Sequence, residues 1–160
     1  MTGSSTNIEM KNFISLWRVA RLAGSGDSQK VIAVCEGELA RNPDDVVLKK
    51  YLSLAYEANG DYSKALQQAV AILACDRNDE LALRIAGGSL AKLERHDEAA
   101  EYVASYLRVA EKQANQSKSL WDRFRDGLKV SDESKEVRSK WIAWARDYQQ
   151  WSGNRRIATR

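Results

Sequence analysis

The sequence predicts an all-α fold, and three observations support this prediction. Apolar residues recur at intervals of three and four along most of the chain, as they do on one face of a helix. Proline occurs once, at Pro43, so few positions interrupt a helix. Short polar turns, several of them containing glycine, separate the apolar stretches. The 160 residues, 44% hydrophobic and 29% charged, are typical of one globular domain with a substantial core.

The chain repeats itself at intervals of 34 residues. Residues at that interval are Gly26, Gly60 and Glu94; Leu22, Tyr56 and Leu90; Val31, Ala65 and Ala99; and Leu39, Leu73 and Leu107. Each unit has apolar residues at helical spacing on both sides of a polar turn, which predicts a helical hairpin. Asp27 and Asp61, each directly after a glycine, can cap the second helix of a hairpin. Asp44 or Asp45 can cap the helix that follows Pro43.

The middle unit resembles the tetratricopeptide repeat, through the segment LSLAYEANGDYSKALQQAVAIL. The residues at family-like positions are Leu52, Tyr56, Gly60, Asp61, Tyr62, Ala65 and Ile72 in this unit; Leu83, Ala86, Gly87, Leu90, Ala99, Val103 and Tyr106 in the third; and Val31, Cys35, Leu39 and Pro43 in the first. Ser53 and Arg77 depart from the pattern, which has glycine and proline there. The resemblance implies three units, about residues 12–45, 46–79 and 80–113, stacked as a short right-handed solenoid.

The first helix has two alternative registers. An unbroken 34-residue spacing turns Arg18 inward, whereas a one-residue insertion in the following turn turns Leu16, Val19, Ala20 and Ala23 inward. The insertion is preferred because it keeps a charged side chain out of the core. Residues 1–11 are expected to form an N-terminal arm.

Residues 114–152 are expected to form a helical extension, followed by a basic tail at 153–160. A helix over about 116–129 would carry Trp121 and Phe124 on one side. A second helix would run from about 131 to 151 and end at Ser152 and Gly153. Its apolar residues lie at alternating steps of four and three and form one stripe: Val137, Trp141, Trp144, Tyr148 and Trp151. Soluble monomers rarely expose an apolar patch as large as these side chains would form, so we expect another part of the protein or a partner to bury the stripe. In order of preference, we expect the end of the solenoid, a second copy of the chain, or another protein.

The composition argues against catalysis, metal binding and nucleic-acid binding. Cys35 and Cys75 lie in apolar helical stretches and are expected to be buried thiols. The single histidine, His96, falls in a polar turn and is expected to be solvated. Residues 1–113 hold 14 basic and 16 acidic side chains, and residues 114–160 hold 11 and 6, with the two signs interleaved in the extension. We therefore expect no enzyme activity, no cofactor, no metal and no nucleic-acid partner.

The sequence also predicts a cytoplasmic protein. The first apolar stretch, around Phe13 to Ala23, contains two arginines, unlike a secretory signal. No apolar run approaches the length that crosses a membrane.

The family resemblance implies where a partner would bind, because the first helix of each repeat lines the concave groove in that family. The groove residues it assigns are Trp17, Val47, Lys50, Tyr51, Leu54, Leu81, Arg84, Ile85 and Gly88, with Trp17 dependent on the register of the first helix. Family members that grip carboxylate tails of chaperones use polar and basic residues here, and this chain has mainly apolar ones. A groove of this kind, with Lys50 and Arg84 as its cations, suits an apolar or amphipathic segment of a partner protein.

These expectations point to an adaptor or chaperone-like module that binds a protein or peptide. One alternative is a structural subunit of a larger complex, or a homodimer, assembled through the aromatic C-terminal helix. A further alternative is a bacterial secretion-system chaperone, since such chaperones resemble this chain in size and repeat number.

Overall fold

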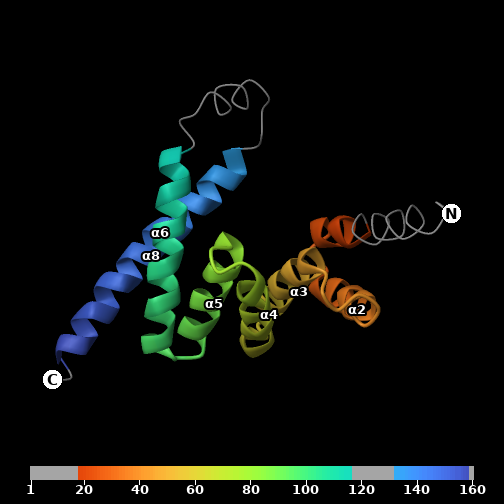
Figure 1. The fold of residues 1–160 in the computed structure, drawn as a ribbon, viewed down its shortest axis with the longest axis horizontal. Helices are drawn as coiled ribbons and strands as arrows, with labels where there is room; N and C mark the ends of the chain where they lie inside the picture. Colours follow the sequence, from red (N-terminus) through yellow and green to blue (C-terminus); the bar gives the residue numbers. More distant parts are fainter. Residues whose placement is uncertain (1–17, 117–131, 159–160) are drawn as a thin grey trace.

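The computed structural model describes residues 18–116 and 132–158, and the described part is all-α (Figure 1). Residues 18–24 belong to a first helix, and the helices after it are α2 (Ser28–Leu39), α3 (Val46–Asn59), α4 (Tyr62–Cys75), α5 (Glu80–Lys92), α6 (His96–Gln116) and α8 (Asp132–Ala158). From α2 to α6 each helix packs against the next, α8 packs against α6, and α3 also touches α5. The chain is therefore an array of helices packed mostly with their neighbours in sequence, as expected.

Aspartates begin three of the helices. The carboxylates of Asp27, Asp45 and Asp79 accept hydrogen bonds from the backbone N–H groups of Lys30, Leu48 and Ala82, at 3.0–3.1 Å. These bonds satisfy N–H groups that have no partner within the helix. Asp61 departs from its prediction, because its side chain makes no capping bond to α4 and accepts one from the Asn59 amide instead.

The turn inside each hairpin uses a left-handed backbone conformation at the same place in the repeat. Gly26 and Gly60 have φ of 74° and 83°, which glycine adopts without cost. Glu94, 34 residues after Gly60, has φ of 60° and is the only non-glycine residue with positive φ among those described. A side chain in this region costs about 1 kcal/mol, so the third turn is strained where the first two are not.

The core runs through the middle of the array in two connected parts. The first part joins α2 to α5, with Leu52, Tyr56, Ala65 and Ile72 buried at its centre. The second joins α5, α6 and α8, where Val103, Tyr106, Leu107 and Ala110 of α6 meet Ala145 of α8. Small residues at the repeat positions allow the close packing, since Ala65, Ala86 and Ala99 are completely buried.

The first helix fits neither of its two expected registers completely. Val19 is completely buried, as the insertion predicts, and Arg18 is exposed, so the unbroken spacing is wrong for Arg18. Ala20 and Ala23 are exposed, which contradicts the insertion. Leu16, Trp17 and the arm at 1–11 lie outside the described residues.

Helix α8 differs from its prediction in length and in orientation. It continues through Ser152 and Gly153 to Ala158, where a stop and a loose tail were expected. Within the helix, the Ser152 hydroxyl donates a hydrogen bond to the carbonyl of Gln149, so this polar group is satisfied although Ser152 is buried. Ala145 and Ser152 are buried, whereas Val137 and Trp151 of the predicted stripe are exposed. The small residues, rather than the largest ones, therefore mark the line of closest approach to α6.

The end of the array covers one side of α8, which was the first of the three covers expected for its aromatic stripe. Trp121, Phe124 and residues 117–129 of the helix predicted over 116–129 lie outside the described residues, and Gln116 is the last residue of α6. None of the described helices combines the length and the apolar character needed to cross a membrane.

Candidate binding surface

Helices α3, α5 and α8 are the elements that carry the candidate surface, and ion pairs join them in a row. Between α3 and α5, Lys50 pairs with Asp79, and the guanidinium of Arg84 donates two hydrogen bonds to Glu57, at 3.1 and 2.9 Å. Between α5 and α8, the salt bridge of Arg138 to Glu80 spans 2.6 Å. These contacts place α8 next to α5 on the side where α5 lies next to α3.

Arg84 is held between a carboxylate and an aromatic ring. Its guanidinium lies over the ring of Trp141 at 4.5 Å from the centroid, while Glu57 binds its edge. The same tryptophan rests on Gly88, where an added Cβ would lie 3.5 Å from the ring. Cation–π contact and a two-point ion pair reinforce one another when water is partly excluded. Trp141 therefore anchors α8 on α5.

The two cations expected to serve a ligand are thus already paired within the chain. Lys50 is bound to Asp79, and the Arg84 side chain keeps only 13% of its surface exposed between Glu57 and Trp141. Sequence reasoning missed both pairs, because the partners come from different helices. Neither Lys50 nor Arg84 is therefore available on the surface between α3 and α5 as an unpaired charge for a ligand.

The structure divides the apolar residues assigned to the groove into exposed and buried groups. Val47 is 46% exposed, and Tyr51, Leu54 and Leu81 are half-buried against the core. Ile85 is completely buried, so its side chain belongs to the core and not to the accessible surface. Gly88 is also buried, beneath Trp141. Trp17 lies outside the described residues. The accessible apolar surface is therefore formed by Val47, Tyr51, Leu54 and Leu81.

The aromatic residues of α8 form a continuous row. Ring centroids are 5.2 Å apart from Trp141 to Trp144, 5.2 Å from Trp144 to Tyr148 and 5.5 Å from Tyr148 to Trp151. At the far end of the row lies His96, which was predicted to be solvated in a turn. Its Nδ1 lies 2.7 Å from the Tyr148 hydroxyl and its ring meets the edge of Trp151, so it is a packing residue rather than a solvated one. No local sequence signal shows this, because 52 residues separate His96 from Tyr148.

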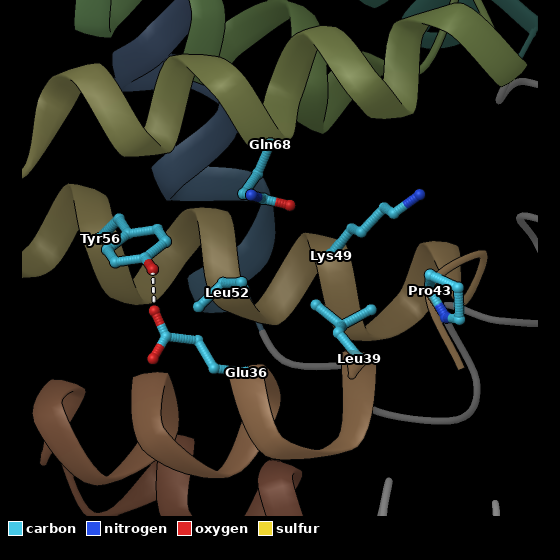
Figure 2. A pocket seen from close by; sticks show the side chains of 7 residues that line it. All are labelled: Glu36, Leu39, Pro43, Lys49, Leu52, Tyr56 and Gln68. Atoms are coloured by element: carbon cyan, nitrogen blue, oxygen red, sulfur yellow. Dashed lines mark hydrogen bonds between the residues drawn. The ribbon is translucent and has the colours of Figure 1, made fainter. Parts of the chain in front are cut away.

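A small cavity of about 280 Å³ opens between α2, α3 and α4. Figure 2 shows its lining: Glu36, Leu39, Pro43, Lys49, Leu52, Tyr56 and Gln68. The Tyr56 hydroxyl donates a hydrogen bond to Glu36, and burial, together with this bond, raises the pKa of Tyr56 to about 12. The cavity is slightly smaller than the usual 300–1,000 Å³ of small-molecule sites. We therefore do not assign a ligand to it.

The cysteines differ from one another, although both were expected to be buried. Cys35 is completely buried, and this burial raises the pKa of its thiol to about 12. Cys75, at the end of α4, is exposed, which contradicts its prediction. Within the described ranges, three side chains of the metal-binding types do not come together anywhere.

Comparisons with known proteins leave the family of the chain open. Neither the models of known protein families nor the curated proteins give a match to this sequence. The function proposed below is therefore supported by the residues and contacts of the chain itself.

Proposed function

We propose that this chain is a non-catalytic protein-binding module of the tetratricopeptide-repeat type, which holds an apolar or amphipathic segment of a partner against α3 and α5. One observation carries the proposal. Val47, Tyr51, Leu54 and Leu81 keep apolar surface exposed on two neighbouring helices, while the charged residues between them are paired with one another.

The repeat assignment is supported by features that recur at the 34-residue interval. Gly26, Gly60 and Glu94 all adopt positive φ, although only two of them are glycine. Asp45 and Asp79, also 34 apart, both cap a first helix through the same hydrogen bond. A common backbone geometry despite different side chains is expected when each unit is one copy of the same hairpin.

The paired charges favour an apolar ligand over a charged one. A ligand carboxylate would have to displace Asp79 from Lys50 or Glu57 from Arg84, leaving a partly buried carboxylate without its cation. Breaking such a pair costs several kcal/mol when the site is buried. Apolar side chains need no such exchange, because they only remove water from Val47, Tyr51 and Leu54.

Tyr51 is the residue that we expect to contribute most to binding. It lies on α3 between Val47 and Leu54, and tyrosine is among the residues enriched at energetically dominant interface positions. The Tyr51→Glu variant places a charge in the middle of the apolar surface. Because Tyr51 is only half-buried, the variant should remain folded.

The test is a binding screen with an immobilised library of 15-residue peptides that varies apolar content and net charge. The wild-type chain should retain peptides with apolar residues at regular intervals. Tyr51→Glu should lose them by a factor of about 30 or more, as expected for a dominant contact of about 2 kcal/mol.

Gln67→Glu is the matched control, since Gln67 is exposed on α4 and receives the same charge. Circular dichroism would verify that both variants are folded. Equal retention of the same peptides by the wild type and by a folded Tyr51→Glu protein would show that this surface is not the binding site.

A further inference from the structure

One flank of α8 remains accessible although the helix is anchored on α5 and α6. Val137 is 55% exposed and Trp151 is 46% exposed. Trp144, midway between them, is half-buried. Residues seven apart on a helix lie about 20° apart around its axis, so the three side chains fall on one flank. Among the described helices, α8 packs against α6 and contacts α5 through Trp141 and Arg138, and the exposure of Val137 and Trp151 shows that neither neighbour fully covers this flank.

Two exposed charges of opposite sign border the same flank. Lys140 and Asp147 are also seven residues apart, and both are exposed. Lys140 is bound to Glu136 within the helix, but the two side chains remain 72% and 64% exposed. An exposed pair of this kind contributes little and leaves the ammonium open to another carboxylate. The flank thus consists of an apolar row with a cation near one end and an anion near the other.

This flank of α8 is complementary to the same flank of a second copy when the two helices run antiparallel. In an antiparallel pair of α8 helices centred between residues 143 and 144, Lys140 of each copy lies beside Asp147 of the other. Trp144 of each copy then lies close to the centre of the pair. In a parallel pair, Lys140 would face Lys140 and Asp147 would face Asp147, and like charges repel. Val137, Trp144 and Trp151 recur every seven residues, as residues on one side of a helix-pairing seam do.

We propose that a second copy of this chain docks on the Val137–Trp144–Trp151 flank of α8, antiparallel and across a two-fold axis near Trp144. The interface uses the same residues on both copies, as a two-fold axis requires. It does not use Tyr51 or Leu54 of α3, so it is independent of the proposed peptide-binding surface.

The association should depend on concentration. Val137, Trp144 and Trp151 are each already partly covered within the chain, so the area left to bury is smaller than that of three free side chains. Interfaces of less than about 1,000 Å² in total form weak or transient complexes. A mixture of monomer and dimer is therefore expected, rather than a permanent dimer.

Sedimentation velocity on the full chain tests the proposal, because it reports mass over a wide range of concentration. The wild type should change from the monomer mass of 18.0 kDa toward twice that mass as concentration rises. Asp147→Lys places a lysine opposite Lys140 of the other copy and should shift the midpoint to at least tenfold higher concentration. Lys140→Glu should do the same.

The double variant Lys140→Glu/Asp147→Lys provides the decisive measurement. It restores opposite charges across the two-fold axis, so it should dimerise within about threefold of the wild-type midpoint. Glu101→Lys is the control for Asp147→Lys, because Glu101 is exposed on α6 and the substitution makes the same change in net charge. It should leave the midpoint unchanged. Circular dichroism would verify that each variant is folded.

Three results would overturn the proposal. The first is a wild-type chain that stays at 18.0 kDa at every concentration, in which case a different protein or nothing covers the flank. The second is a dimer that folded Asp147→Lys leaves unchanged, which would place the interface elsewhere. The third is a folded double variant that remains as weak as the single variants. None of these results affects the peptide-binding proposal, which the Tyr51→Glu screen tests separately.

Discussion

Two adjacent glycines in the middle of α5 should respond in opposite directions to the same substitution. Alanine is more favourable than glycine inside a helix by about 1 kcal/mol, and this gain applies to Gly87→Ala and Gly88→Ala alike. The two positions differ in their surroundings. At Gly88, the new methyl group would lie 3.5 and 3.7 Å from two ring carbons of Trp141, which are ordinary contacts. Gly88→Ala should therefore stabilise the chain by about 1 kcal/mol.

At Gly87, the methyl group would lie 2.9 Å from a methyl carbon of Val103 and 3.4 Å from its backbone nitrogen. Val103 is only 1% exposed and is β-branched in a helix, so its side chain has little freedom to move. Overpacking of this kind costs about 1–3 kcal/mol, which offsets or exceeds the helix gain. Gly87→Ala should therefore be destabilising by about 1 kcal/mol.

The comparison between the two variants is more informative than either value alone. Both replace glycine by alanine in the same helix, so the effect on the unfolded chain largely cancels. The expected difference of about 2 kcal/mol corresponds to about 4–8 °C in the melting temperature of a chain of this length. Thermal unfolding followed by circular dichroism at 222 nm measures it. If Gly87→Ala melts at or above the temperature of Gly88→Ala, the close packing of α5 on α6 is not as described.

Three other predictions concern single residues. Glu94→Gly should raise stability by about 0.5–1 kcal/mol in urea unfolding, because glycine relieves the positive φ, whereas Glu94→Ala should give no such gain. In the native protein, a thiol reagent should label Cys75 rapidly and Cys35 only after unfolding, and rapid native labelling of Cys35 would contradict its burial. The pKa of Tyr56 is raised from 10.0 to about 12, so its neutral form is favoured in the folded state. Its contribution to stability should be complete below pH 10 and should disappear as the pH rises through about 12. Alkaline titration at 295 nm should show one tyrosine fewer titrating late in Tyr56→Phe than in wild type.

Much of the local structure of the repeats could be predicted from short-range sequence patterns. Helices began after Asp27 and Asp45 as expected, because a carboxylate can accept hydrogen bonds from backbone N–H groups only three residues away. Asp79 caps α5 in the same way without having been predicted, and the cap expected at Asp61 does not form. The turns at Gly26 and Gly60 use a positive φ that glycine adopts without strain, although Glu94 takes the same conformation in the third turn. Apolar spacing placed Ala65 and Ala99 in the core. All of these effects act within one or two turns of helix, where sequence patterns are informative.

The accessibility of individual residues, by contrast, depends on contacts between helices that are distant in the sequence. Helical spacing assigns Ile85 and Arg84 to the same region of α5, but one is completely buried and the other lies between Glu57 and Trp141. These outcomes depend on how segments 27–58 residues apart approach one another, as for Glu57 and Arg84 or for Glu80 and Arg138. No pattern within one helix contains that information.

The orientation of α8 was decided in the same way. Its four-three stripe is equally compatible with a face centred on the aromatic residues and with one turned toward Ala145 and Ser152. The second was selected because small side chains let α8 approach α6 closely, while Trp141 could still reach Gly88 and Arg84 on α5. Val137 and Trp151 were left exposed for this reason, because they lie on a different side of α8 from Ala145 and Ser152.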